Sequence, residues 1–300
     1  MPRSRQFPGL TAVLVALLVC SGCVSLHPPI EVGSIERINA DGPIRGYWAK
    51  VRLDHPAVEI VVTGPLAPDA VNPPGSEARL TTVPQWAEAE RMTLAVNANF
   101  FGGIVPPVPG EKDPGWFAGR PVDLRGLSLS DGVVVSPPRF VANQADPALL
   151  FYKDGRARII RAVVADLAGV ADAVAGIGYS DDGKQPGGLL VTAGDNTGAT
   201  ARVAPEVRHP RTAAGVTSDG RTLILVVVDG RQQGYSIGVT LPELADIMIG
   251  LGAANAINLD GGGSTTFYYH QPDGTLLTNK ASGSTWRPVG NHLGVRLKKN

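Results

Sequence analysis

The chain has 300 residues, which is enough to bury a sizeable hydrophobic core. Its 27 basic and 27 acidic side chains cancel, so the composition lacks the basic excess of nucleic-acid-binding proteins, and we expect no nucleic-acid partner. Its 37 glycines and 25 prolines, together with many Val and Thr residues, favour strands and turns.

The N-terminus has the layout of a signal peptide. Basic residues precede the apolar run 10–19, which is too short for a membrane span, and small residues then lead into Cys23. Small residues directly before a cysteine resemble the lipobox of bacterial lipoproteins, although Cys20 stands where that pattern usually has Leu. Ordinary signal cleavage is the alternative, but the segment lacks a clean cleavage site for it.

We therefore expect a lipoprotein signal peptide over 1–22, a lipid on Cys23 and a tether over 23–33. This layout predicts a protein that is lipid-anchored in the bacterial cell envelope, in the outer membrane facing the periplasm or the exterior, with the lipid as its only membrane contact. With both cysteines used in this way, the domain over 34–300 would contain no disulfide and no Cys-ligated zinc.

The first strand and helix signals follow the tether. Alternating or β-rich patterns predict strands over 46–53 and 58–63. Thr82, with Gln85 three residues later and a proline between them, predicts a helix over 82–91.

The run 93–101 predicts a strand in which Asn97 and Asn99 share one face. Buried amides need hydrogen-bond partners, so two of them are unexpected in a purely apolar core. They either line a ligand site or form a structural hydrogen-bond ladder.

The middle of the chain is rich in turns. Residues 104–121 predict a long loop, in which Trp116 either stacks on a ligand or packs the loop down. Hairpins are predicted around Asp131-Gly132 and Asp154-Gly155, whereas 163–175 fits either a helix or a strand.

The unbroken apolar run 222–228 predicts a strand that is covered on both faces, and it ends in Asp229. Thr240 and Glu243 then form a capping box, and the apolar spacing behind them predicts an amphipathic helix over 240–251.

That helix leads into a strand, 255–260, which ends in Asp260 and is followed by three glycines and three hydroxyl residues. Alternation places Asn258 and Asp260 on one face. The bare glycine amides can approach a polar, anionic or sugar-like ligand closely, whereas a Gly-rich turn is the structural alternative. Because 82–103 has the same order of capped helix, strand, polar face and glycines, we expect both strand ends to converge on one cleft.

Seven stretches together resemble the phosphodiester glycosidase family, and they cover most of residues 90–297. The Asp-Gly-Gly-Gly-Ser block and the helix before it are the most specific. The stretches are 97–103, 126–136, 211–217, 227–231, 234–245, 259–265 and 287–294.

The resemblance implies an α+β fold, with mixed, mostly antiparallel β-sheets and a few packed helices in a single compact catalytic domain. It also implies a hydrolase that cleaves the glycosidic C–O bond of a sugar-1-phosphodiester, but it does not settle the acceptor or the sugar. Together with the envelope targeting inferred from the N-terminus, it leads us to expect a substrate among envelope or extracellular glycans. The products would be a free sugar and a phosphomonoester.

Within this interpretation, Asp260 and Asp229 are the candidate catalytic carboxylates, each acting as a nucleophile or as a base for water. Arginines, glycine amides and hydroxyls would hold the leaving phosphate, the asparagines would bind sugar hydroxyls, and a histidine would shuttle a proton. The expected substrate-binding residues are Asn97, Asn99, Arg211, Thr212, Gly261, Gly262, Ser264, Thr265, Arg287, Asn291 and His292.

Each assignment has a structural alternative: an ion pair for Arg211, a strand-end turn for Asp229 and a purely structural role for His292. A lipid-tethered, non-catalytic glycan-binding protein is the main rival function. A metal-dependent phosphodiesterase is a third, although the His/Asp clusters of such enzymes are missing from the sequence. The residues make no cofactor certain. A divalent cation such as calcium, held by Asp229, Asp260 and backbone oxygens, is an open alternative that nothing in the spacing demands.

Overall fold

The computed structural model describes residues 28–68, 71–104, 115–141, 143–177 and 188–298. Within these ranges 44% of the residues lie in strands and 11% in helices, and there are two α-helices. The expected α+β class is therefore wrong, and the fold is mostly β. Both α-helices are short, and each packs against a sheet rather than forming a layer of its own. The signal peptide and Cys23 lie outside the described residues.

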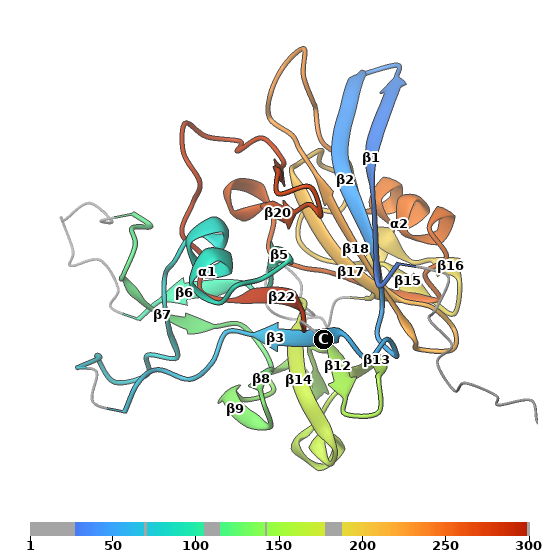
Figure 1. The fold of residues 1–300 in the computed structure, drawn as a ribbon. Helices are drawn as coiled ribbons and strands as arrows, with labels where there is room; N and C mark the ends of the chain where they lie inside the picture. Colours follow the sequence, from blue (N-terminus) through green and yellow to red (C-terminus); the bar gives the residue numbers. More distant parts are fainter. Residues whose placement is uncertain (1–27, 69–70, 105–114, 142, 178–187, 299–300) are drawn as a thin grey trace, which may run out of the picture.

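The largest sheet has seven strands, and all of its paired strands are antiparallel. Residues 30–33, which the sequence pattern assigned to the tether, are paired with β2 in this sheet. In spatial order the strands are β1 (Ile30–Asn39), β2 (Gly42–Arg52), β18 (Thr222–Val228), β17 (Arg211–Val216), β19 (Asn255–Asn258), β15 (Val191–Thr192) and β16 (Asp195–Asn196) (Figure 1).

Two five-stranded antiparallel sheets complete the main architecture. The first contains β21 (Leu276–Thr278), β20 (Phe267–His270), β5 (Leu94–Asn97), β22 (His292–Leu297) and β3 (Val58–Val62). The second contains β13 (Arg156–Arg161), β12 (Pro147–Tyr152), β14 (Val170–Ala175), β8 (Ser128–Ser130) and β9 (Val133–Ser136). The smaller elements are β4 (Ala78–Arg79), β7 (Pro121–Leu124), β6 (Phe101–Gly103), β10 (Phe140–Val141), β11 (Gln144–Ala145) and the 3-10 turns η1 (Val164–Leu167), η2 (Gly198–Thr200) and η3 (Gly262–Ser264).

The three large sheets share one hydrophobic core, to which β18 contributes one of its faces. Leu223 and Leu225 of β18 pack into this core, whereas Ile224 and Val226 face the helix α2 (Leu241–Gly250). The prediction of a strand covered on both faces is confirmed. Each fully buried Leu side chain contributes about 1.5–3 kcal/mol of transfer free energy. This burial fixes the position of β18 and therefore of Asp229, which follows it.

Both predicted α-helices are present and begin where their caps indicate. In α1 (Val83–Ala89) the Thr82 hydroxyl accepts a hydrogen bond from the Gln85 backbone amide at 3.4 Å. In α2 the capping box is complete, because the backbone amides of Thr240 and Glu243 each donate to the side chain of the other residue, at 2.9 and 3.3 Å.

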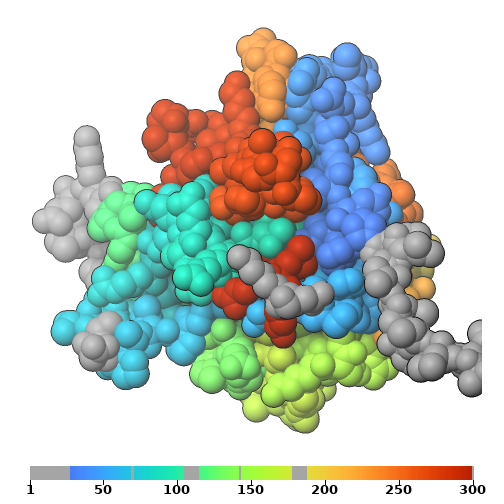
Figure 2. Space-filling view, in the orientation of Figure 1, coloured from blue at the N-terminus to red at the C-terminus, as the bar shows by residue number. Residues whose placement is uncertain are grey.

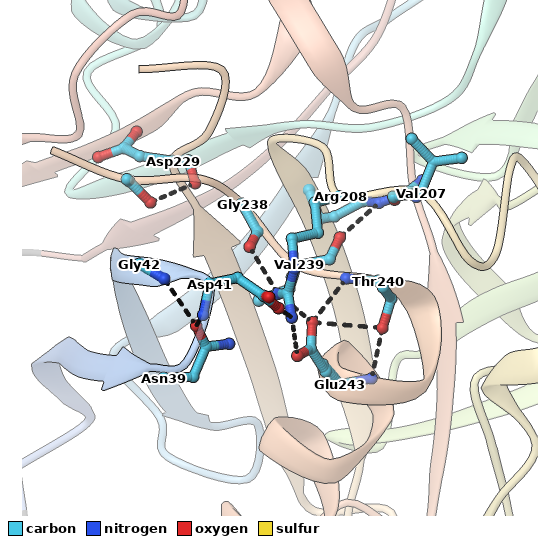
Figure 3. A network of polar contacts seen from close by, with 12 residues as sticks. Asn39, Asp41, Gly42, Val207, Arg208, Asp229, Gly238, Val239, Thr240 and Glu243 are labelled. Carbon is cyan, nitrogen blue, oxygen red and sulfur yellow. Dashed lines mark hydrogen bonds and ion pairs between the residues drawn. The ribbon is translucent and has the colours of Figure 1, made fainter. Parts of the chain in front are cut away.

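An arginine extends the cap of α2 to the hairpin between β1 and β2 (Figure 3). Arg208 binds both carboxylate oxygens of Glu243, at 2.6 and 2.7 Å, and the Asp41 carboxylate at 2.8 Å. Such bidentate pairs fix orientation as well as distance. The helix start is thereby tied to the hairpin that forms one side of the sheet.

The two predicted hairpins are also confirmed, as β8–β9 and β12–β13. At the first turn, Asp131 and Gly132 have φ angles of 46° and 77°, which suits an Asp-Gly pair. The ambiguous segment 163–175 contains η1 and then β14, and the predicted strand 93–101 is interrupted after Asn97. In the part of the chain described, no helix is long and apolar enough to cross a membrane.

The cap of α2 provides a direct stability test. Replacing Thr240 with Ala removes the acceptor for the Glu243 amide, and we expect the free energy of unfolding to fall by about 0.5–2 kcal/mol. Chemical denaturation would measure the loss. Ser34→Ala on the exposed face of β1 is the control, and an equal loss in both variants would contradict the importance of this cap.

Candidate functional site

The candidate site lies where β18 and β19 end. Both strands are antiparallel to β17, which lies between them, so their carboxyl ends meet at the same edge of the sheet. Asp229 follows β18, and Asp260 follows β19 after one more residue. With strands about 4.8 Å apart, the two acids emerge about 10 Å from each other along this edge.

The end of β5 meets the same edge, through Asn97. This side chain is fully buried; its amide nitrogen donates to the Asp260 carbonyl, and its oxygen accepts from the Thr212 hydroxyl at 2.8 Å and the Thr266 amide at 3.0 Å. The Asp260 amide in turn donates to the Ala98 carbonyl at 3.0 Å. The two strand ends therefore meet, whereas the cleft on which we expected them to converge stays a prediction. Asn97 and Thr212 hold the backbone that carries Asp260.

Two further predicted residues, Asn99 and Asn291, lie in the interior. The Asn99 oxygen accepts from the Ala175 amide at 3.0 Å and from the Asn291 side chain at 2.9 Å. Its amide nitrogen faces three backbone carbonyls at residues 125–127. This arrangement is the structural hydrogen-bond ladder that we considered as the alternative to a ligand site. It indicates that Asn99 and Asn291 position the chain around residues 125–127 rather than bind a sugar.

His292 is also enclosed, with 1% of its surface exposed. Its ring nitrogens contact the Thr63 hydroxyl at 2.8 Å and the Thr81 carbonyl at 3.1 Å, and the ring stacks on Trp86 at 4.8 Å. Burial lowers the pKa of His292 to about 4, so the ring is neutral at physiological pH. Because both ring nitrogens contact the protein and the ring is neutral, His292 is poorly suited to the proton-shuttle role that we expected.

Arg211 is buried, and its guanidinium binds backbone carbonyls of the described chain. Its guanidinium donates to the backbone carbonyls of Val203, Ala204, Val207 and Val239 at 2.8–3.3 Å. Burial, and then the neighbouring Arg231, lower its pKa to about 10. Since its donors are directed at the chain, Arg211 shapes the loop beside the site, and the ion pair considered as its alternative is not formed among the described residues.

The glycine turn after Asp260 is flanked by two other arginines. A Cβ atom added at Gly263 would lie 2.4 Å from the Arg287 Cζ atom, and one added at Gly262 would lie 3.2 Å from both terminal nitrogens of Arg231. The missing side chains therefore make room for two guanidinium groups against one turn. The φ angle of 61° at Gly262 also favours glycine.

Asp260 is the acid of this turn, and the residue as a whole is partly exposed. Desolvation by the surrounding chain raises its pKa to about 6, against the lowering effects of Ser264, Arg287 and the Gly261 amide. The Gly261 amide donates to one carboxylate oxygen at 2.9 Å. A carboxyl group with this pKa can change its protonation state near neutral pH.

Two hydroxyls of the turn lack an aligned hydrogen-bond partner among the described residues. Ser264 and Thr265 are buried, and neither hydroxyl makes a hydrogen bond of good geometry in the described part of the chain. The Ser264 hydroxyl lies close enough to Asp260 to lower the pKa of that carboxyl, but it is not aligned for a full hydrogen bond. Buried polar groups are rarely left unpaired, so these two hydroxyls are the strongest sign of a ligand at the turn.

Asp229 is 1% exposed, and its carboxylate is occupied by protein donors. It accepts from the Asn279 side chain at 2.8 Å, the Tyr235 hydroxyl at 3.2 Å and the Lys280 amide at 3.3 Å. Burial raises the pKa of Asp229, and burial together with the Asp229 charge raises the pKa of Tyr235 to about 12. Asn279 also donates to the Thr265 carbonyl at 3.3 Å, so Asp229 supports the glycine turn from behind.

Sequence reasoning missed Arg231 and His209 as site residues. Arg231 is exposed, has a φ angle of 61°, and donates to the His209 ring at 3.2–3.4 Å. Burial, followed by Arg231 and Arg211, lowers the pKa of His209, which keeps the ring available as an acceptor. The one sequence pattern that could have indicated Arg231 is the Asp229-Gly230-Arg231 segment at the end of a buried strand.

The remaining predicted features are placed as follows. Trp116 packs edge-on against Phe101 at 5.0 Å and under Arg120 at 4.6 Å, so it anchors the described part of its loop. A surface hollow of about 410 Å³ lies at the opposite edge of the sheet, where Asn255 begins β19. Among the described residues, no three His, Cys, Asp or Glu side chains converge as metal ligands.

Comparison with known proteins places the chain in a family. The family model for phosphodiester glycosidases matches residues 91–296, a range that includes β18, β19 and the glycine turn. The chain belongs to the phosphodiester glycosidase family. The resemblance stated from the motifs is thereby confirmed.

Curated relatives match over parts of their length. The SPbeta prophage-derived uncharacterized protein YomE of Bacillus subtilis is 30% identical over 190 residues, which are 61% of this chain and 25% of YomE. The N-acetylglucosamine-1-phosphodiester alpha-N-acetylglucosaminidase of Bos taurus is 36% identical over 77 residues, 26% of this chain and 14% of that protein. The chain thus matches a quarter or less of either relative.

Solved structures support the fold at lower sequence identity. The catalytic domain of the zebrafish N-acetylglucosamine-1-phosphodiester alpha-N-acetylglucosaminidase, auto-inhibited by its pro-peptide, has a TM-score of 0.62 at 20% identity, covering 91% of this chain and 85% of that one. A putative exported protein from Burkholderia pseudomallei K96243 has a TM-score of 0.56 at 18% identity, covering 85% and 74%.

The raised pKa of Asp260 predicts that this acid destabilises the fold when ionised. The folded protein binds the proton more tightly than the unfolded chain, so stability is lost as the pH rises from about 4 through 6. Asp260→Asn should therefore raise the free energy of unfolding at pH 8 by roughly 2–3 kcal/mol, with the gain vanishing at pH 4. Denaturation at both pH values would measure this, with exposed Asp195→Asn as the control; a loss of stability at pH 8 would contradict it.

Proposed function

We propose that the protein is a hydrolase that cleaves the glycosidic C–O bond of a sugar-1-phosphodiester, releasing the sugar and a phosphomonoester. Family membership supports a phosphodiester glycosidase. The observation that carries the proposal is the turn after Asp260. It combines one carboxyl group of raised pKa with two nearby guanidinium groups and with two buried hydroxyls that lack an aligned hydrogen-bond partner in the described ranges.

The chemistry of such a substrate matches these groups. The leaving group is already a phosphate, so it needs its negative charge stabilised more than it needs a proton. Arg231 and Arg287 are placed to bind phosphate oxygens, and guanidinium groups suit this geometry. The hydroxyls of Ser264 and Thr265 add donors, as in other sites that stabilise developing charge.

Asp260 is the proposed catalytic carboxylate. An oxocarbenium-like transition state is stabilised by a carboxylate near the anomeric carbon, which acts as the nucleophile or as a base for water. Asp229, the other candidate, makes three protein hydrogen bonds, so we assign it to positioning the turn. The same reassignment applies to Asn97, Asn99, Arg211, Thr212, Asn291 and His292, whose polar groups bind the chain.

The proposed setting is the bacterial envelope, with glycans of the envelope or the exterior as substrates. It rests on the signal-like N-terminal segment and on the lipobox-like residues before Cys23. Metabolic labelling with a fatty-acid probe, compared between the full chain and Cys23→Ala, is the direct measurement for the lipid anchor.

A panel of sugar-1-phosphodiesters tests the activity. We expect purified protein to release free sugar from at least one member, and in ¹⁸O-labelled water we expect the label to enter the sugar. Label in the phosphate product would mean P–O cleavage and would contradict the proposed bond. Binding of the same compounds without release would favour a non-catalytic glycan-binding protein.

The pH dependence tests the role of Asp260. Because the ionised carboxylate is the required form, kcat/KM should rise with pH, with a midpoint near 6, and should level off above it. Asp260→Asn should lower kcat/KM by about 10²–10⁴-fold and abolish the rise of kcat/KM with pH. A profile that falls through pH 6 would instead make Asp260 a proton donor.

A substitution of Arg287 tests the same pH dependence of kcat/KM. Its charge lowers the pKa of Asp260, so Arg287→Gln should shift the midpoint of the pH profile above that of the unmodified protein. Arg158→Gln, on the exposed face of β13, is the control and should leave the midpoint unchanged.

A further inference from the structure

The edge of the sheet that carries Asp260 continues beyond the proposed site to β2. The Asp229 amide donates to the Arg45 carbonyl at 2.8 Å, and the sheet order is β2, β18, β17, β19. Three strand spacings therefore separate the backbone at Arg45 from that at Asp260, or about 14 Å. One phosphodiester group leaves much of this edge uncovered.

Two cations occupy this further part of the edge. The Arg45 guanidinium lies 5.2 Å from the centre of the Tyr235 ring, and the Lys280 ammonium lies 4.5 Å from it. Both charged side chains are exposed, whereas the Tyr235 hydroxyl points to the buried carboxylate of Asp229. Each of the two positive charges, which come from distant segments of the chain, therefore lies close to the same ring.

Neither cation forms an ion pair within 4.0 Å in the described ranges, although the Lys280 charge acts on Asp229 and lowers the pKa of that carboxyl. Glu36 lies opposite Arg45 in the pairing of β1 with β2, but no ion pair within 4.0 Å joins them. Asp229 binds the Tyr235 hydroxyl, and its carboxylate accepts three hydrogen bonds from the protein. The charges of Arg45 and Lys280 therefore remain available to a ligand.

The two cations are connected to the glycine turn through Arg231 and its neighbours. Gln232 donates to the Lys280 carbonyl at 3.3 Å, and the Ser282 hydroxyl donates to the Gly262 carbonyl at 3.4 Å. Figure 2 shows the corresponding segments side by side, with the orange loop after β18 between the blue hairpin and the red-orange segment. Positive groups thus follow one edge from Arg287 to Arg45.

We propose that Arg45 and Lys280 bind a second phosphate group, on the acceptor side of the scissile phosphodiester, so that the substrate is a glycan with more than one phosphate. The inference rests on the proposed function for the position of the first phosphate. Guanidinium and ammonium groups both bind phosphate oxygens. Packing against one aromatic ring restricts the conformations of both side chains, so their charges stay at this edge.

Three substrates that share the same sugar and the same acceptor test the proposal. The first acceptor is uncharged, the second carries a phosphate monoester, and the third carries a carboxylate at the same position. We expect the phosphorylated substrate to have a kcat/KM about five- to tenfold above the uncharged one at low salt. This ratio should fall toward one as salt is added, because exposed charges are screened.

The double variant Arg45→Gln, Lys280→Gln should bring the ratio close to one, whereas Arg158→Gln should leave it unchanged. Equal kcat/KM for the charged and uncharged substrates in the unmodified protein would overturn the proposal. A ratio that survives the double substitution would also overturn it. A preference for the carboxylate over the phosphate would contradict the assignment of the second group as phosphate.

Failure of the proposed function would be distinguishable. If no substrate is cleaved, calorimetric titration with the doubly and the singly phosphorylated acceptor fragments still measures the subsite. Tighter binding of the doubly phosphorylated fragment, lost in the double variant, supports the second phosphate site without catalysis. Equal binding of both fragments counts against it.

Discussion

One buried amide, that of Asn97, holds together the segments on which the site depends. It joins the end of β5 to the Thr212 hydroxyl on β17, to the Asp260 carbonyl and to the Thr266 amide. Because Asn97 is enclosed, a lost contact would leave a polar group unpaired in the interior, which costs more than the bond contributes. The position of Asp260 therefore depends on two sheets and on the core between them.

The arginines around this edge divide into two kinds. Arg211 is buried, and its donors are directed at four carbonyls of the protein. Arg231 and Arg287 are more exposed and lie against glycines of the turn. Burial of a cation is costly, so a buried guanidinium must satisfy its donors within the chain, whereas the two arginines at the turn remain suited to an incoming anion.

Local sequence signals predicted much of the fold. The caps at Thr82 and Thr240, the Asp-Gly hairpins and the two-sided apolar strand β18 all depend on neighbouring residues, and the structure contains each of them. The fold class was wrong because caps and periodicity locate helices without showing how little of the sheet surface they cover.

The candidate site was predictable only in part. The Asp260 turn was identifiable from the acid, the glycines and the hydroxyls in one stretch. Whether an asparagine, a histidine or an arginine faces a ligand depends on contacts with segments far away in the chain. His292, for example, is enclosed by Thr63, Thr81 and Trp86, and no local pattern indicates those neighbours. Arg231 was overlooked because its proximity to Gly262 arises only when β18 and β19 flank β17.

The pairing of β1 with β2 also sets the direction in which the site faces. Ile30 pairs with Val51, and Glu36, six residues later, pairs with Arg45 at the edge where Asp229 emerges. A strand rises about 3.3 Å per residue, so the start of β1 lies about 20 Å below that edge. Any attachment upstream of Ile30 would therefore join the sheet at the end opposite to the edge where Asp229 and the glycine turn lie.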